Sequence, residues 1–211
     1  LLGQVPAFNR GWFASGFGPF RRFDGGIENP SKIFENSPRV EAFSTLFEPS
    51  FALTSIRAWL RKLFFEQIEE KNNVLRQIGH FLNHGELLPR NLKFNSLTSE
   101  GVFFKDIHGK LIELSFLSDG HRSVLSLTFE LIRQLIRTYG EEKVFANIQK
   151  GEMNIPLPGV VIIDEVDAHL HPTWQTKIGQ WFTKYFPQLQ FIVTTHSPLI
   201  CRACGDHGKI F

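Results

Sequence analysis

The sequence is poor in cysteine, lacks a long apolar run and has almost no excess of charge of one sign. Cys201 and Cys204 are the only cysteines in 211 residues, too few for the disulfide framework of a small secreted domain. No secretory signal and no run of about 18 apolar residues is present, which favours a cytoplasmic protein without a membrane span. The net charge of +2 identifies no nucleic-acid or membrane partner by itself.

A phosphate-binding loop of the form Gly-x-x-x-x-Gly-Lys-Ser/Thr is also missing. Gly109-Lys110 and Gly208-Lys209 lack both the first glycine at the required distance and the following hydroxyl residue. We therefore do not expect these residues to hold nucleotide phosphates alone. The sequence begins at Leu1 without methionine and ends at Phe211 in a strand-like run, so we expect it to be a piece of a longer protein.

The residues that are present describe an ordinary globular chain with an unusual aromatic composition. Hydrophobic residues make up 42% and charged residues 21%, which is typical of a packed core. There are 22 Phe but only four Trp and two Tyr. This excess predicts a core filled with flat rings, or an interface covered by a partner.

The first third of the chain predicts one strand, a connection and one long helix. Residues 11–20 mix aromatic and small residues, as a short strand and loop would. Three prolines in residues 27–50 favour a surface connection over a packed element. Apolar residues then recur with helical spacing over 54–82, where Ser55 can act as the N-cap. A core-facing helix is favoured over a partner-binding one, and Trp59 and Phe64-Phe65 are assigned to the core unless they prove exposed.

The middle of the chain predicts a hairpin followed by a helix. The β-rich runs Gly101–Lys105 and Leu111–Phe116 are separated by a glycine-containing turn. The polar loop with Ser118 and Gly120 then opens a helix that ends at Gly140.

The last third predicts a strand, a helix and a strand. Val160–Ile163 is a continuous apolar run, which is typical of a strand buried on both faces, and it ends in Asp164-Glu165. A helix over 173–185 leads to a second such strand, Gln190–Thr195, which ends in His196. This order predicts two parallel strands joined by a right-handed crossover, and therefore an α/β fold.

Ligands of parallel sheets bind beyond the carboxyl ends of the strands, where these polar residues lie. Asp164 can hold Mg²⁺ and Glu165 can orient an attacking water, although acidic residues also simply terminate strands. The functional interpretation is favoured because three features occur together in the chain: this acidic pair, His196 and the helix start at Ser118-x-Gly120. A helix N-terminus offers N–H groups to a phosphate.

Four stretches resemble the motifs of a known family. Leu117–His121 resembles the ABC signature, Val160–Glu165 the Walker B motif, Asp167–Pro172 the D-loop and Thr195–Pro198 the switch histidine. Together they resemble ABC-type ATPases of the SMC, RecF and OLD group. With Gly16–Arg22 included, the chain is most similar to the ATPases of the Septu antiphage system and their retron-associated relatives.

The resemblance implies an ABC-type P-loop ATPase fold that binds ATP and Mg²⁺ and acts as a homodimer or a higher homo-oligomer. Ser118 and Gly120 would touch the γ-phosphate held by a second copy, and Asp167 would communicate across the dimer. The resemblance further implies that Asp164 holds Mg²⁺. The same resemblance assigns polarisation of the attacking water to Glu165.

The resemblance also makes His196 the γ-phosphate sensor. The phosphate-binding loop of the family would precede Leu1, so the chain alone is expected to be inactive. We expect the chain to have three parts: a strand and loop region of the ATPase core (1–53), a helical lobe with the hairpin and signature (54–140), and the Walker B, D-loop and switch-histidine part (141–211).

Three functions stay open at this point. The first is the ATPase subunit of a prokaryotic antiphage complex, in which dimerisation controls an HNH-type nuclease partner and DNA is a further partner. The second is the ATPase part of an OLD-like nuclease or of a RecF-like or SMC-like DNA-repair ATPase. The third is a scaffold that binds nucleotide without hydrolysing it.

Three other groups of residues could bind a ligand, but each also has a simpler interpretation without one. His169 and His171 beside Asp167 could bind a metal, but hydrogen bonding within the D-loop is favoured. Cys201 and Cys204 with His207 form only half of a zinc site, so two buried helix cysteines are favoured. Arg21-Arg22 would either meet phosphates or form a solvated pair.

Overall fold

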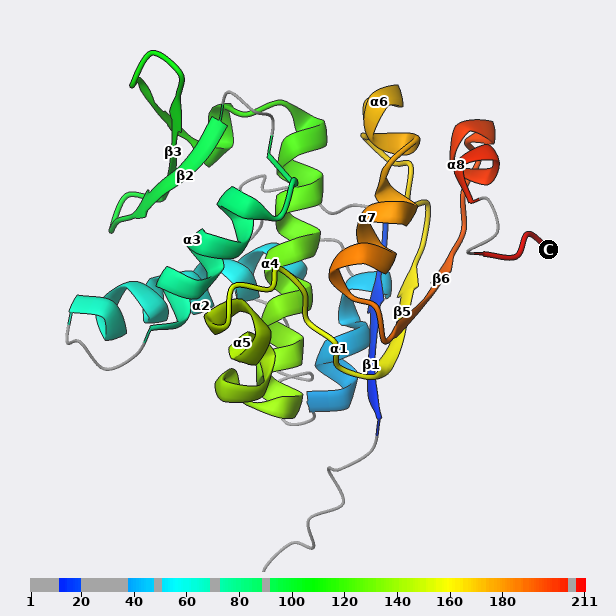
Figure 1. Cartoon of the computed structure of the whole chain (residues 1–211), viewed down its shortest axis with the longest axis horizontal. Coiled ribbons are helices and arrows are strands. Elements are labelled where there is room, and N and C mark those ends of the chain that lie inside the picture. Colours follow the sequence, from blue (N-terminus) through cyan, green and yellow to red (C-terminus); the bar gives the residue numbers. More distant parts are fainter. Residues whose placement is uncertain (1–11, 20–37, 48–50, 69–72, 89–91, 205–207) are drawn as a thin grey trace, which may run out of the picture.

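A computed structural model describes residues 12–19, 38–47, 51–68, 73–88, 92–204 and 208–211. These residues form a parallel sheet, a long central helix and a second layer of helices and antiparallel strands (Figure 1). The elements are β1 (Phe13–Phe17), α1 (Pro38–Phe47), α2 (Phe51–Ile68), α3 (Val74–His84), β2 (Leu92–Leu97), β3 (Val102–Asp106), β4 (Leu111–Glu113), η2 (Leu114–Phe116), α4 (Asp119–Tyr139), α5 (Glu141–Gln149), β5 (Gly159–Ile163), α6 (Pro172–Gln175), α7 (Ile178–Tyr185), β6 (Leu189–Val193) and α8 (Pro198–Ala203).

The parallel sheet has the strand order β1-β5-β6. Gly159 pairs with Phe13 in its register, and a Cβ at Gly159 would lie 2.7 Å from the Phe13 carbonyl oxygen, so only glycine allows this close approach. Val161 and Ile163 of β5 are fully buried. The two parallel strands predicted over the last third are confirmed, and the fold is α/β.

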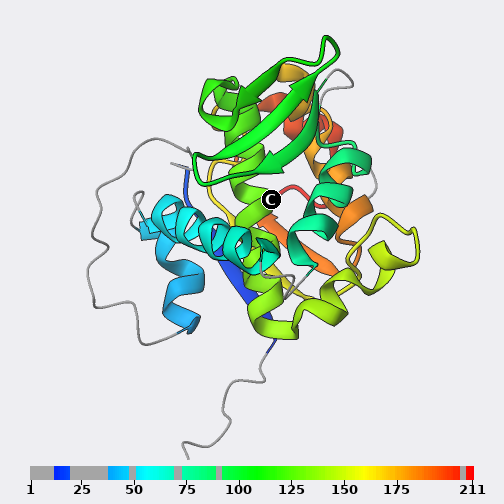
Figure 2. The same cartoon turned by 90° about the vertical axis from the view of Figure 1, so that its left-hand side faces the viewer.

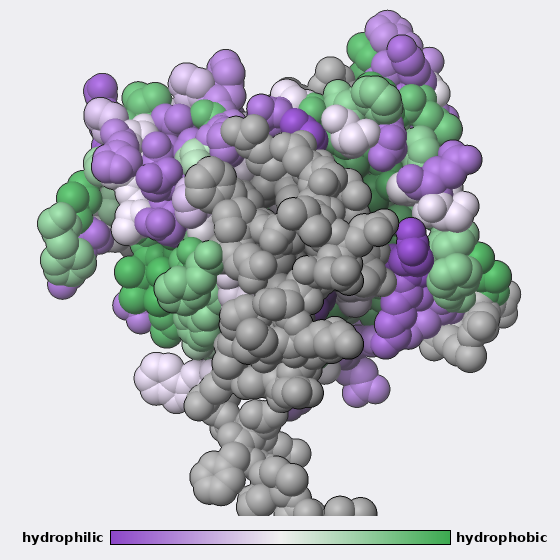
Figure 3. Space-filling model, turned by 180° about the vertical axis from the view of Figure 1, so that it is seen from behind, coloured by the Kyte–Doolittle hydropathy of each residue, from purple (hydrophilic) through white to green (hydrophobic). Residues whose placement is uncertain are grey.

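The prediction that β6 is buried on both faces is wrong. Among the described residues, β6 forms the edge of its sheet, and half of Ile192 is exposed. Apolar surface is visible on the side of the molecule where β6 and the C-terminal residues lie (Figure 3, left). In β5, which has a strand on each side, Val161 and Ile163 are buried and Val160 and Ile162 are half-buried, so the prediction of burial on both faces is confirmed only in part.

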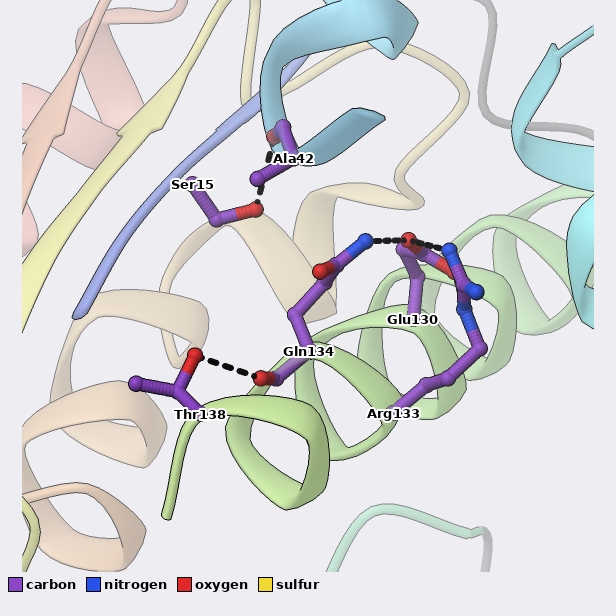
Figure 4. Close-up of polar contacts among 6 residues, drawn as sticks. All are labelled: Ser15, Ala42, Glu130, Arg133, Gln134 and Thr138. Carbon is purple, nitrogen blue, oxygen red and sulfur yellow. Dashed lines mark hydrogen bonds and ion pairs between the residues drawn. The ribbon is translucent and has the colours of Figure 1, made fainter. Parts of the chain in front are cut away.

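Helix α4 lies between the parallel sheet and the second layer (Figure 1). Its predicted ends are confirmed, because Ser118 is the N-cap and Gly140, at φ +85°, follows the last turn. Several polar side chains are buried in it, and three of them form a linked group. Arg133 donates two hydrogen bonds to Glu130, at 2.7 and 2.8 Å, and Gln134 donates one at 2.7 Å (Figure 4). Pairing the buried charges avoids the cost of leaving either one uncompensated.

The second layer contains α2, α3 and the antiparallel sheet β2-β3-β4 (Figure 2). The single helix predicted over 54–82 is wrong, because α2 ends at Ile68 and α3 begins after Asn73. Ser55 is not an N-cap, since α2 already begins at Phe51.

The predicted hairpin is confirmed in β3 and β4. Leu114–Phe116 leaves the sheet as a 3₁₀ turn. Strand β2 was not predicted. It pairs with β3, and its Phe94 ring packs against Phe104 of β3 with ring centroids 6.0 Å apart.

Helix α1 corrects the prediction that residues 27–50 are only a surface connection. It begins at Pro38, whose fixed φ suits the first turn of a helix, and it packs on β1. Ser15 of β1 donates a hydrogen bond of 2.9 Å to the carbonyl of Ala42 (Figure 4). Arg21-Arg22 lies outside the described residues.

An aromatic cluster joins α3 to the helices of the parallel sheet. Phe81 of α3 makes edge contacts with Trp181, Tyr185 and Phe186, with centroids 5.8 to 6.3 Å apart. Many of the phenylalanines thus fill the core, as predicted. Trp59 and Phe64 pack against this core, whereas Phe65 is 55% exposed.

The predicted helix over 173–185 is interrupted, because α6 ends at Gln175 and α7 begins at Ile178. Within the described residues, no helix is both long enough and apolar enough to span a membrane.

Candidate functional site

The carboxyl ends of β5 and β6 and the N-terminus of α4 lie at the same end of the molecule (Figure 1). The residues that follow these strands are polar, and parallel strands place such residues at one edge. This edge brings together Asp164, Glu165, Asp167 and His196, four of the residues that the sequence singled out.

A threonine links the ends of the two strands. Thr194 donates a hydrogen bond from Oγ1 to Asp164 Oδ1 at 2.5 Å, and the same oxygen accepts the Glu165 N–H at 2.8 Å. Glu165 has a φ of +46°, a conformation that costs energy for a residue with a Cβ. The Thr194 hydroxyl therefore helps to hold both acidic residues in place. Sequence reasoning did not single out Thr194, because its two partners lie about 30 positions away in the chain.

Asp167 forms a second link between the same two segments. Thr195 donates a hydrogen bond from its hydroxyl to Asp167 Oδ1, and the backbone N–H of His196 donates to the same oxygen at 3.2 Å. This carboxylate therefore fixes the backbone on which the His196 side chain is carried. Ser197 follows and caps α8 by accepting the Leu199 N–H at 3.2 Å.

Ser118 is exposed at the start of α4, and its Oγ lies 2.7 Å from His121 Nδ1. Gly120 is buried instead. A Cβ at Gly120 would lie 3.0 Å from the carbonyl oxygen of His169 and 3.6 Å from the amide of His171. The start of α4 thus packs directly on the loop that follows Asp167. The structure gives Gly120 a contact within its own chain, which the sequence did not predict.

The oxygen-rich composition of this edge fits a magnesium ion. Carboxylates such as Asp164 and Glu165, and the hydroxyl of Thr194, are the ligand types that Mg²⁺ takes. In the part of the chain that the structure describes, no three His, Cys, Asp or Glu side chains are grouped as a complete metal centre. A bound Mg²⁺ would complete its shell with water and substrate phosphate, as it commonly does.

The remaining candidates have structural roles where they are described. His171 caps α6, because its Nδ1 accepts the Thr173 N–H at 3.3 Å, and His169 has a φ of +65° in the same loop. Cys201 and Cys204 lie half-buried in and just after α8, while His207 falls outside the described residues. Half-burial differs from the full burial expected of these cysteines.

Cavities also lie outside this group of strand-end residues. An open one of about 640 Å³ is lined by α3, β2 and the end of α5 and contains none of the predicted site residues. A groove of about 470 Å³ runs along the outer edge of β6, where Ile192 and Val193 line it together with α7 and α8.

Comparison with known proteins identifies the family. The model of the family described as "AAA domain, putative AbiEii toxin, Type IV TA system" matches residues 14–202. The chain belongs to this AAA-domain family. The match runs from β1 to α8 and thus includes every strand of the parallel sheet.

Relatives of this AAA-domain protein agree with the resemblance seen in its motifs. It is 30% identical to the Septu protein PtuA of Bacillus mycoides over 76% of the chain and 20% of that protein. It is 37% identical to the retron Vc95 probable ATPase of Vibrio cholerae over 44% of the chain and 16% of the relative, and 40% identical to the retron Ec83 probable ATPase of Escherichia coli over 44% and 15%. The predicted resemblance is confirmed. The alignments span between about a seventh and a fifth of these relatives.

Among solved structures, the SMC head domain from Thermotoga maritima is similar to 67% of the chain at 18% identity, with a TM-score of 0.41 over 44% of that structure. An SMC head domain from Pyrococcus furiosus gives a TM-score of 0.42 at 15% identity, over 76% of the chain and 38% of that structure.

Proposed function

We propose that this AAA-domain protein supplies half of an ATP-hydrolysing site, with Asp164 holding Mg²⁺, Glu165 orienting the attacking water and His196 contacting the γ-phosphate. Mg²⁺ would neutralise charge on the phosphates when bound. Thr194 holds the Asp164 carboxylate and the Glu165 backbone, so the two acids do not need to reorganise before reaction. Asp167 positions the backbone of His196 in the same way.

The observation that carries this proposal is the shared edge. Residues from β5, β6 and the start of α4, distant in sequence, meet at the place where parallel sheets bind ligands. Two threonine hydroxyls and the carboxylates of Asp164 and Asp167 cross-link the strand ends. A pair of acids that only terminated a strand would not require such links to a second strand.

Ser118 supports a site shared between two copies. The side chain is exposed at the N-terminus of α4, where backbone N–H groups and the helix dipole favour a phosphate. In the proposed dimer, Ser118 and the turn around Gly120 face the γ-phosphate held by a second copy. Asp167 lies in the loop that packs beneath this turn and so connects the two halves of the site.

The phosphate-binding loop must come from outside these 211 residues. The described sheet has two edge strands, β1 and β6. We favour β6 for a further parallel strand, because Ile192 and Val193 are exposed there beside an apolar groove. An edge strand presents unpaired backbone N–H and C=O groups to which a further strand can pair. We propose that the strand carrying the loop pairs with β6.

The biological setting is proposed from the relatives. The Septu protein aligns with 76% of the chain and the two retron ATPases with 44% of it, so we propose an antiphage complex in which ATP-dependent dimerisation controls an HNH-type nuclease, with DNA as a further partner. This setting depends on the resemblance and the relatives, whereas the ATPase half depends on the site.

The test uses the full-length protein that contains these residues. Glu165→Gln should retain ATP, stop hydrolysis and increase the fraction of dimer measured by mass photometry. Ser118→Arg should leave ATP binding by the separate subunit within about twofold and abolish turnover. Unchanged hydrolysis in Glu165→Gln would remove this residue from the mechanism.

A matched control is Glu152→Gln, a carboxylate to amide change at an exposed residue that precedes β5, whereas the site lies at the carboxyl end of that strand. It should leave turnover and dimerisation unchanged. Nucleotide binding without turnover in the wild-type protein would favour the scaffold function instead.

A further inference from the structure

The first turn of α4 is organised by two side-chain pairs, each spanning three residues. Ser118 Oγ lies 2.7 Å from His121 Nδ1, and Arg122 forms an ion pair with Asp119. Asp119 would place a negative charge where the proposed function puts a phosphate. Its pairing with Arg122 offsets that charge, so the serine lies in a turn that is less repulsive to an anion.

Ser118 does not use its side chain as an N-cap serine usually does. Such a serine accepts a hydrogen bond from a backbone N–H two or three residues later, yet Ser118 makes no such bond. Its hydroxyl is engaged by the imidazole of His121 instead. The histidine therefore decides how this hydroxyl is oriented.

The direction of that hydrogen bond determines what Ser118 can offer to a phosphate. Phosphate oxygens accept hydrogen bonds, so the serine must present its single proton to them. If the serine donates to Nδ1, the proton is occupied by the ring. If Nδ1 carries the hydrogen and donates to Oγ, the hydroxyl proton is free to point outward.

We propose that His121 is a positioning residue for Ser118, donating from Nδ1–H to Oγ so that the hydroxyl proton is directed to the γ-phosphate of a second copy. This inference rests on the proposed function. A neutral imidazole carries its hydrogen on one of its two nitrogens, and the proposal assigns it to Nδ1. Burial lowers the pKa of His121, which keeps the ring uncharged at neutral pH.

The test compares His121→Gln with His121→Leu in the full-length protein. Glutamine retains an N–H donor that reaches Oγ, and leucine has similar bulk without one. We expect leucine to lower kcat about tenfold or more, a smaller loss than the roughly 10²–10³-fold seen when a transition-state donor is itself removed, while the KM for ATP changes less than about twofold. Glutamine should restore most of kcat. Exposed His108 provides the control, and His108→Leu should leave both parameters unchanged.

A double-mutant cycle separates positioning from a general structural effect. If His121 acts through Ser118, the pair Ser118→Ala with His121→Leu should lose no more kcat than Ser118→Ala alone. Additive losses, a normal kcat in His121→Leu, or equal losses for leucine and glutamine would each overturn the inference while wild-type turnover stays intact. A wild-type protein that neither hydrolyses ATP nor dimerises with it would overturn the proposed function itself, and this inference with it.

Discussion

Trp181 donates a hydrogen bond from its indole N–H to the carbonyl of Gly85 at 2.6 Å. The bond is buried and joins α7, beside the parallel sheet, to the end of α3 in the second layer. Next to it, Lys184 forms an exposed ion pair with Glu86 at 2.8 Å. The same side of α7 carries the rings that pack against Phe81. These contacts fix the second layer relative to the strands of the site.

We expect Trp181→Phe to lower the free energy of unfolding by about 2–4 kcal/mol. The change removes part of a buried ring and leaves the buried Gly85 carbonyl without its donor, and each effect has a substantial cost. Urea denaturation followed by circular dichroism measures it. Trp12→Phe is the matched control, because Trp12 is 82% exposed, and it should change the free energy of unfolding by less than about 0.5 kcal/mol. Equal effects would show that the indole hydrogen bond contributes nothing.

The sequence predicted local patterns better than long-range ones. The buried strand β5 and both ends of α4 followed from the apolar run and from the residues Ser118 and Gly140, because these signals are local. The edge position of β6 could not be predicted in this way, since an apolar run does not state which strands pair with it.

The candidate site shows the same difference between local and long-range signals. Asp164, Glu165 and His196 follow strands, so their shared edge could be predicted from the parallel order. Thr194 could not be chosen over other threonines, because its importance comes from hydrogen bonds to residues about 30 positions away. The contact of Gly120 with the His169 carbonyl is equally long-range and equally absent from the motif.

Gly120→Ala should disturb the start of α4. The added Cβ would lie 3.0 Å from the His169 carbonyl oxygen, a backbone atom that cannot move away freely, so we expect a loss of about 1–3 kcal/mol in unfolding free energy. Because Ser118 is two residues away, turnover by the full-length protein should fall as well. Gly179→Ala in α7 is the control: no atom lies within 4 Å of its Cβ, and alanine should stabilise the helix by up to about 1 kcal/mol. Similar behaviour of the two variants would contradict the packing role.

Thr194→Val should reduce hydrolysis more than stability. Valine has nearly the same shape, but it cannot donate to Asp164 or accept the Glu165 N–H. We therefore expect kcat in the full-length protein to fall about tenfold or more, as happens when a group that preorganises a site is lost. Thr183→Val removes a similar hydroxyl from the exposed face of α7 and should leave kcat unchanged. A Thr194→Val protein with normal turnover would show that the two acids do not depend on this link.

The stability of the protein should depend on pH through His121. Burial lowers the pKa of this imidazole below its ordinary value of 6.5, so below about pH 6.5 the unfolded chain binds a proton more readily than the folded protein does. By linkage, the contribution of His121 to the free energy of unfolding is complete above this value and is lost as the pH falls through the folded-state pKa. His121→Gln has no titrating ring, so its stability should fall less on acidification from pH 8 to pH 5 than that of the wild type. Urea denaturation of both proteins across this range measures the difference, with His108→Gln as the exposed control. If the wild-type and His121→Gln curves stay parallel throughout, the folded protein does not disfavour the charged ring, and burial does not keep His121 neutral beside Ser118.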